Sequence, residues 1–189
     1  VIIYIMNIFI LDNDPIQAAQ LQCDKHVVKM IVESAQMLST VHRMVDGIME
    51  RRPSKSGSML QYFKLDDDRE DILYKACHYN HPSTVWTREC CKNYDWHYRH
   101  FVALCEEYTY RYGKTHATDL KLRSILRNPP HGITRTDNKT PFKLAMSSNP
   151  ECIFEDAVKS YRAFYRTKQE RFKMVWTKRQ QPEWFYALI

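Results

Sequence analysis

One long stretch of helical periodicity, uninterrupted by proline or glycine between Pro15 and Gly47, constrains the fold of this chain more than any other feature. Asp14 is a typical N-cap, and Pro15 suits the first helical position. Apolar residues then follow the three-and-four spacing of one helical face: Val28, Ile31, Ala35, Leu38 and Val45. The stretch therefore predicts one helix from Pro15 to about Gly47.

Similar periodicity predicts two further helices. The second runs from near Pro82 to just before Gly113, a residue type common just past a helix end. Its predicted aromatic face contains Trp86, Cys90, Tyr94, His97, Phe101, Leu104, Tyr108 and Tyr112. The last starts at about Pro150 and carries Ile153, Phe154, Ala157, Tyr161, Phe164 and Tyr165 inward. A shorter helix with an acidic first turn is expected within residues 65–80, and residues 46–58 and 127–141 are interpreted as loops.

These elements predict a mainly α fold, a compact single-domain bundle of about three long helices with an extended N-terminal segment and long loops. With 189 residues, the chain suits one domain, residues 1–189, and its 4 glycines favour helices over a turn-rich β fold. The apolar residues 1–11 are expected to form a buried strand or extended segment, too short to span a membrane. Met6 is the plausible initiator, so we expect residues 1–5 to lie upstream of the native start.

The 6 cysteines are even in number, but no secretory signal accompanies them, so we expect reduced thiols and a cytoplasmic monomer, in the host cytoplasm if a phage encodes it. The histidines and cysteines between Cys77 and Cys105 match no familiar zinc spacing, so no metal is expected. A glycine-rich phosphate loop, a nucleophile elbow and an HExxH motif are all absent from the sequence. No cofactor is expected.

A narrow line of polar residues interrupts the apolar first helix. Lys25, Lys29, Glu33 and Gln36 lie at steps of four, four and three, and His26 adjoins Lys25. A surface helix usually exposes about half of its circumference to water, so this narrow polar strip is more typical of a helix that lines a cleft. One interpretation is a structural ion pair between Lys29 and Glu33. The other is a carboxylate held between cations, which can stabilise positive charge on a reacting sugar or transfer protons.

The C-terminal region is strongly basic in a chain whose net charge is +6. Its cations are Lys159, Arg162, Arg166, Lys168, Arg171, Lys173, Lys178 and Arg179. Aromatic residues lie between and after them: Tyr165, Phe172, Trp176, Trp184 and Tyr186. Cations bind phosphates and exposed aromatic rings stack on unpaired bases, so the region indicates nucleic acid. A solvated helix face above core aromatics is the alternative.

A second possible anion site precedes the predicted second helix. His81 and Pro82 stand before Ser83 and Thr84 of its first turn, where free backbone amides can hold a phosphate. Helix capping by these residues explains the pattern equally well.

Three separated segments resemble a known family, the pyrimidine-dimer DNA glycosylases of the phage endonuclease V type and their bacterial relatives. The stretch "DKHVVKMIVESAQML" is similar to the family's first helix, with Lys25, His26, Lys29, Val32 and Glu33 at the positions of Lys-Arg-x-x-Lys-x-x-Val-Glu. "HPSTVWTRE" and "EEYTYRYG" resemble a His-Pro…Trp-Arg segment and the Glu-Glu-x-x-x-Arg-x-Gly that follows it. The end "QPEWFY" resembles a Pro-x-Trp-Tyr terminus.

The resemblance implies a DNA glycosylase and abasic-site lyase that binds double-stranded DNA and flips a nucleotide. Its nucleophile is the α-amino group of the processed N-terminus, here of Met6 or Asn7, and Glu33 is its catalytic carboxylate. The expected DNA contacts are Lys25, His26, Lys29, Arg162, Arg166, Arg171, Lys178, Trp184 and Tyr186. The expected pocket residues are Gln36, His81, Trp86 and Arg88.

The chain departs from the phage enzyme where Val32 replaces an arginine, so the lesion or modified base stays open. Two alternatives from other classes stay open as well. One is a non-catalytic nucleic-acid-binding protein on the same scaffold. The other is an enzyme of nucleotide or modified-base metabolism with Glu33 and His81 in its pocket.

Overall fold

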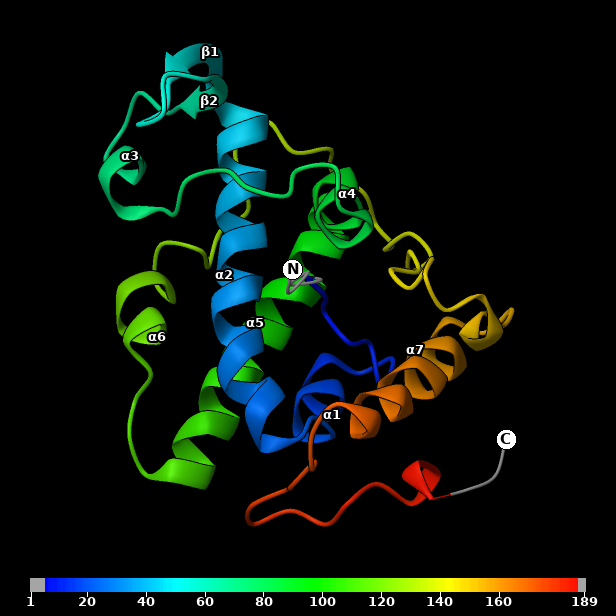
Figure 1. Cartoon of the computed structure of the whole chain (residues 1–189). Helices are drawn as coiled ribbons and strands as arrows, with labels where there is room; N and C mark the ends of the chain where they lie inside the picture. The colour runs from blue at the N-terminus through cyan, green and yellow to red at the C-terminus, as the bar shows by residue number, and fades with distance from the viewer. Residues whose placement is uncertain (1–5, 187–189) are drawn as a thin grey trace.

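The computed structural model describes residues 6–186, and the fold over this range is mainly helical (Figure 1). Two long helices, α2 (Asp24–Asp46) and α5 (Cys91–Tyr112), pack against each other at its centre. The prediction of about three long helices is wrong in this detail, because the last predicted helix is shorter. It appears as α7 (Ala157–Arg166), preceded by a short 3-10 turn, η1 (Pro150–Cys152). Asp156 caps α7 by accepting a hydrogen bond from the Lys159 backbone N–H.

The predicted first helix is divided in two, α1 (Pro15–Gln20) and α2. Asp14 caps α1 as expected, and α2 ends before Gly47 as expected. The break lies at residues 21–23, where backbone donors are used by distant parts of the chain. The Cys23 N–H donates to the Tyr165 hydroxyl over 2.9 Å, and the Asp24 N–H donates to the Val175 carbonyl over 2.8 Å. Tertiary hydrogen bonds therefore replace the helical ones that periodicity alone predicted.

The predicted second helix is also divided, into α4 (Pro82–Glu89) and α5, with extended backbone at Cys90. The Asn93 side chain donates to the Trp86 carbonyl over 2.7 Å, and the Cys91 N–H donates to the Thr134 carbonyl over 2.9 Å. The irregular loop 127–141 thus packs over the break. Gly113 ends α5 with φ of 68°, the left-handed conformation expected of it.

The interpretation of residues 46–58 as a loop is wrong. Most of this segment belongs to an antiparallel hairpin, β1 (Ile48–Pro53) and β2 (Met59–Lys64), in which Ile48 pairs with Lys64. Both strands are largely exposed, so they lack the alternation of apolar and polar residues that marks a half-buried strand. The expected acidic helix that follows is one turn long, α3 (Arg69–Ile72).

Arg43 holds this region to α2. Its buried guanidinium donates to the carbonyls of Phe63, Glu70, Leu73 and Tyr74 and pairs with the Glu70 carboxylate.

Residues 6–11 form a buried extended segment without a strand partner among the described residues. The segment turns at Phe9, whose φ is 56°. The expectation about residues 1–5 lies outside the described part of the chain. The remaining elements are α6 (Ala117–Leu122), η2 (Thr167–Glu170) and η3 (Glu183–Phe185). No helix within residues 6–186 is long and apolar enough to cross a membrane.

Candidate active site

Glu33 lies on α2 with only 8% of its surface exposed, and both of its carboxylate oxygens have partners. The Asn7 backbone N–H donates to Oε2 over 3.1 Å, and the Lys29 ammonium lies 3.1 Å from Oε1. Burial raises the pKa of Glu33, whereas Lys29, the Asn7 N–H and the nearby His78 act in the opposite direction. The carboxylate is therefore fixed in place and sensitive to its few charged neighbours.

Asn7 is held so that its backbone nitrogen stays directed at Glu33. Its side-chain amide donates to the Ala145 carbonyl over 3.1 Å, and its side-chain oxygen accepts from the Phe9 N–H over 2.8 Å. Only 1% of Asn7 is exposed. Asn7 is thus fixed by three hydrogen bonds, one from its backbone nitrogen to Glu33 of α2 and two from its side chain to Ala145 and Phe9.

A cavity of about 380 Å³, here called the Glu33 cavity, opens beside this nitrogen. Its lining comes from the N-terminal segment, α2 and two connecting segments: Met6, Val28, Lys29, Val32, Glu33, Gln36, His78 and His116. His78 lies between α3 and α4, and His116 is the N-cap of α6, where its Nδ1 accepts from the Thr118 N–H. Apolar walls with a few convergent polar groups are typical of a ligand site.

The structure brings four of the expected site residues together: Asn7, Lys29, Glu33 and Gln36. Sequence reasoning had not placed His78 or His116 with them. Both lie outside the long periodic stretches, and only the tertiary fold brings them to α2. No periodic signal in the sequence marks either of them.

Other expected site residues lie outside the lining of the Glu33 cavity. His26 is buried against the Phe9 ring at 4.7 Å, with Nδ1 at 2.8 Å from the Tyr165 hydroxyl. Burial, with Lys29 and other nearby lysines, lowers the pKa of His26 to about 3, so this ring is neutral at neutral pH. Lys25 is exposed, and its ammonium lies 4.4 Å from the centre of the Phe172 ring.

The three expected pocket residues of α4 support the surrounding structure. His81 caps α4, its Nδ1 accepting from the Ser83 N–H over 3.2 Å, and burial lowers its pKa. Trp86 is buried and donates to the Thr140 carbonyl. Arg88 donates to the carbonyl of Tyr79, in the segment that carries His78.

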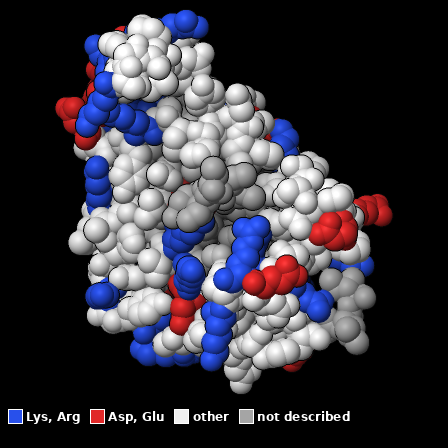
Figure 2. Space-filling model, viewed as in Figure 1, with Lys and Arg blue, Asp and Glu red and all other residues white. Residues whose placement is uncertain are grey.

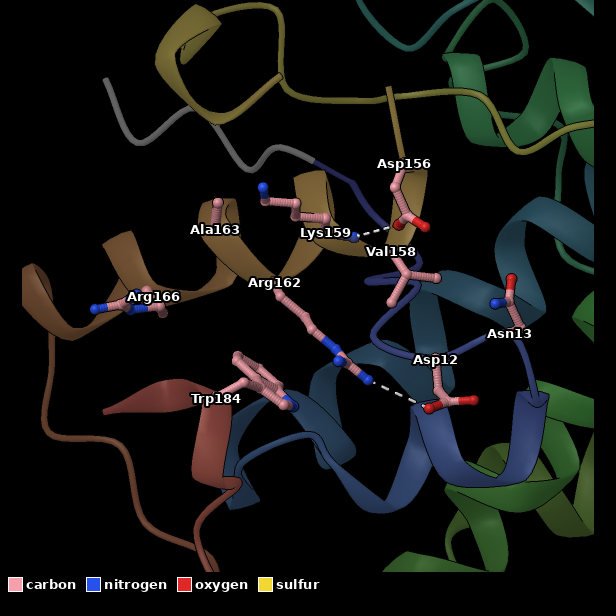
Figure 3. A pocket seen from close by; sticks show the side chains of 9 residues that line it. All are labelled: Asp12, Asn13, Asp156, Val158, Lys159, Arg162, Ala163, Arg166 and Trp184. Atoms are coloured by element: carbon pink, nitrogen blue, oxygen red, sulfur yellow. Dashed lines mark hydrogen bonds and ion pairs between the residues drawn. The ribbon is translucent and has the colours of Figure 1, made fainter. Parts of the chain in front are cut away.

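A second cavity, of about 480 Å³, lies between α7 and the C-terminal segment (Figure 3). Its lining is Asp12, Asn13, Asp156, Val158, Lys159, Arg162, Ala163, Arg166 and Trp184. Arg162 extends from α7 past the Trp184 ring, 5.4 Å from its centre, to Asp12 at 3.3 Å. The Trp184 indole N–H has no hydrogen-bond partner among the described residues. Three cations beside one aromatic ring suit a phosphate with an adjoining base.

The remaining expected DNA contacts lie on the C-terminal segment after α7. Arg171 is exposed, and Tyr186 is 70% exposed. The Lys178 ammonium donates to the Tyr110 carbonyl at the end of α5. Figure 2 shows Lys and Arg side chains gathered between the lower half of α2 and the C-terminal end of α7, so one face of the molecule is positively charged there.

The sequence model of one protein family, described as pyrimidine dimer DNA glycosylase, matches residues 6–120. The matched range contains every residue that lines the Glu33 cavity, whereas α7 and Trp184 lie beyond it. No curated protein and no solved structure gives a significant match to the chain.

Proposed function

Because the chain belongs to the pyrimidine dimer DNA glycosylase family, we propose that it excises a damaged pyrimidine from duplex DNA and then cleaves the strand at the abasic site. The observation that carries the proposal is the 3.1 Å hydrogen bond from the residue-7 nitrogen to Glu33, at the edge of an open cavity. Cleaving a glycosidic bond through an amine requires a nitrogen and a carboxylate in such an arrangement.

The proposed nucleophile is the α-amine of a mature N-terminus at Asn7. An α-amine has a pKa near 7.7–8.0, against about 10.4 for lysine, so more of it is unprotonated at neutral pH. The unprotonated amine attacks the sugar carbon C1′. An N–C1′ bond forms, the bond from C1′ to the base breaks, and the base leaves with the bonding electron pair. The attached amine then loses one proton to solvent, and the bond from C1′ to the ring oxygen O4′ breaks as O4′ takes up a proton, which leaves a protonated imine.

Glu33 is the proposed catalytic carboxylate. Through Oε2 it orients the amine, and its negative charge stabilises the cationic sugar and the protonated imine. Strand cleavage then needs a base to remove a proton from C2′, so that the bond from C3′ to the phosphate oxygen breaks. A carboxylate whose pKa burial has raised suits this transfer better than a fully solvated one.

The basic face supplies the proposed DNA contacts. Arg166 and Lys159 line the second cavity, between α7 and the C-terminal segment, without an ion pair to another described residue, so they are available for phosphates. Trp184 offers a ring for stacking beside them. Flipping a nucleotide costs a few kcal/mol, and least at a damaged pair, which contributes to selectivity. We propose that one protein molecule acts on one duplex.

Borohydride trapping tests the proposal. Protein with a mature N-terminus at Asn7, verified by mass spectrometry, is incubated with duplex DNA carrying a pyrimidine dimer, and borohydride reduces any imine to a stable adduct. We expect an adduct with the unaltered protein and none with Glu33→Gln, which keeps its DNA affinity. Glu106→Gln, at an exposed glutamate on α5, is the matched control and should trap normally.

Two results would contradict the proposal in different ways. DNA binding without any adduct would favour the non-catalytic binding protein. Normal trapping and strand cleavage by Glu33→Gln would refute the role of Glu33 while leaving an amine mechanism in place.

A further inference from the structure

His78 faces the Glu33 cavity from the segment between α3 and α4, and its backbone is unusual. Its φ is 47°, in the left-handed region that residues with a side chain rarely adopt. Such conformations persist only where the surrounding structure imposes them, and they cluster at functional sites. The conformation alone does not identify a role, so the contacts around it matter.

The residues on both sides of His78 are fixed to the helices that form the site. Thr40 lies on α2, seven residues or two turns after Glu33, and its hydroxyl accepts from the Cys77 N–H over 3.1 Å. Arg88 of α4 donates to the Tyr79 carbonyl. The His78 carbonyl itself accepts from the His81 N–H over 2.9 Å. These bonds hold the strained residue at the mouth of the cavity.

Most of the other polar groups of the cavity are already engaged by described residues, except the Gln36 side chain, an amide that cannot act as a proton-donating acid. Both oxygens of Glu33 have partners, and Lys29 pairs with Glu33. His116 uses Nδ1 to cap α6. No hydrogen bond joins the His78 imidazole to another described residue, and the ring is exposed at the rim. The charged or titratable groups that face it are Lys29 and Glu33 from α2, His81 at the start of α4 and His116 at the start of α6.

The proposed reaction has a proton requirement that Glu33 does not meet. As the glycosidic bond breaks, the departing pyrimidine gains an electron pair and needs a proton. Glu33 is an anion that holds the amine, so it acts as an acceptor at that moment. Histidine is the side chain best suited to donate and regain a proton near neutral pH.

We propose that His78, as the imidazolium, donates its proton to the departing pyrimidine. Glu33 orients the amine on the other side of C1′. The imidazole becomes neutral in this step and regains a proton from solvent at the exposed rim. This inference rests on the proposed function. It adds a second catalytic residue, used only in base excision, because no base leaves during strand cleavage at an existing abasic site.

The test compares two substrates under single-turnover conditions with borohydride: a duplex with a pyrimidine dimer and a duplex with a preformed abasic site. The variant is His78→Asn, because asparagine tolerates the left-handed conformation better than most residues. His131→Asn, at an exposed histidine on the loop beside the other end of α2, is the matched control. Thermal unfolding of each variant is measured alongside.

We expect His78→Asn to slow adduct formation on the dimer by about 10²–10⁴-fold, the usual contribution of a general acid. On the abasic duplex its rate should stay within about twofold of the unaltered protein, as should both rates of His131→Asn.

Equal losses on both substrates would overturn the inference, since they indicate a structural role for His78. Equal rates of His78→Asn and the unaltered protein on the dimer would overturn it as well. If the unaltered protein forms no adduct on either substrate, the proposed function fails and this inference fails with it. That result is distinct from the other two.

Discussion

The backbone nitrogen of Asn7 lies 3.1 Å from Glu33 Oε2, although the two residues are 26 positions apart in the sequence. The contact joins the buried N-terminal segment to the centre of α2. The contact matters for the chemistry, because an amine at the position of this nitrogen would contact the Glu33 carboxylate and lie beside the Glu33 cavity. The proposed chemistry depends on this relationship more than on any other in the structure.

Lys29 should control the pH at which the site becomes active. Burial raises the pKa of Glu33, and the Lys29 ammonium lowers it by a smaller amount. Lys29→Met removes this lowering effect, so the pKa of Glu33 should rise further. If activity needs ionised Glu33, the acidic limb of the pH–rate profile moves to higher pH. Single-turnover strand cleavage of abasic duplex between pH 4.5 and 8 measures it. Lys29→Arg keeps the charge and should leave the limb nearly unmoved; a limb unmoved in Lys29→Met would refute the coupling.

Arg166 and Trp184 should contribute to DNA binding in different ways. Arg166→Ala removes one phosphate contact, so the slope of log affinity against log salt should fall by about 0.9. Trp184→Ala should weaken binding by about 1–3 kcal/mol with an unchanged slope, because stacking releases few ions. Fluorescence anisotropy at several salt concentrations measures both. Arg51→Ala, on the exposed β1 strand beyond the C-terminal end of α2, is the control. No salt dependence at all would favour a small-molecule enzyme.

Four buried histidines should make the protein sensitive to acid. Burial lowers the pKa of His26 to about 3 and of His42 and His100 to about 4, and lowers that of His97 well below its usual value. Below about pH 6.5 the unfolded chain binds protons that the folded chain does not, so stability falls as pH falls. Each histidine contributes about 1.4 kcal/mol per pH unit until its folded pKa is reached.

Urea unfolding at pH 7.5, 6.0 and 5.0 measures this loss of stability. A free energy of unfolding that stays constant over this range would contradict the burial of these rings as neutral imidazoles. His131→Asn serves as the control, because His131 is exposed and makes only a small contribution to the lowered pKa of His42, so its removal should change the pH dependence little.

Local signals predicted the start of α1 and the end of α5 correctly. The caps at Asp14 and Gly113 act through residues next to them in the chain, so the sequence alone contains the information. The breaks at Cys23 and Cys90 depend on Tyr165 and Thr134, which are distant in the sequence. Periodicity continues through both breaks, and for that reason it predicted two continuous helices.

In the candidate site, too, the sequence predicted the residues marked by a local signal and missed those positioned by distant parts of the chain. The polar line on α2 and the family resemblance both indicated Glu33, because its signal lies within one helix. The contribution of His78 depends on how Thr40 and Arg88 hold the segment between α3 and α4. His26 belongs to the same short motif as Glu33 and lies two turns before it on nearly the same face of α2, but its ring packs against Phe9 and its Nδ1 lies 2.8 Å from the Tyr165 hydroxyl. Which of the two faces a cavity is decided by the segments that pack against α2 at each turn, and these are distant in the sequence.

The most direct test of the account identifies the nitrogen that carries the sugar. The adduct trapped by borohydride on dimer-containing duplex is digested with nuclease and protease, and the modified peptide is sequenced by mass spectrometry. We expect the sugar remnant on the α-nitrogen of an N-terminal Asn7. The strongest rival amine is Lys168, whose pKa burial lowers to about 8. A remnant on Lys168 or another lysine, or no adduct at all, would contradict the pairing of the residue-7 nitrogen with Glu33.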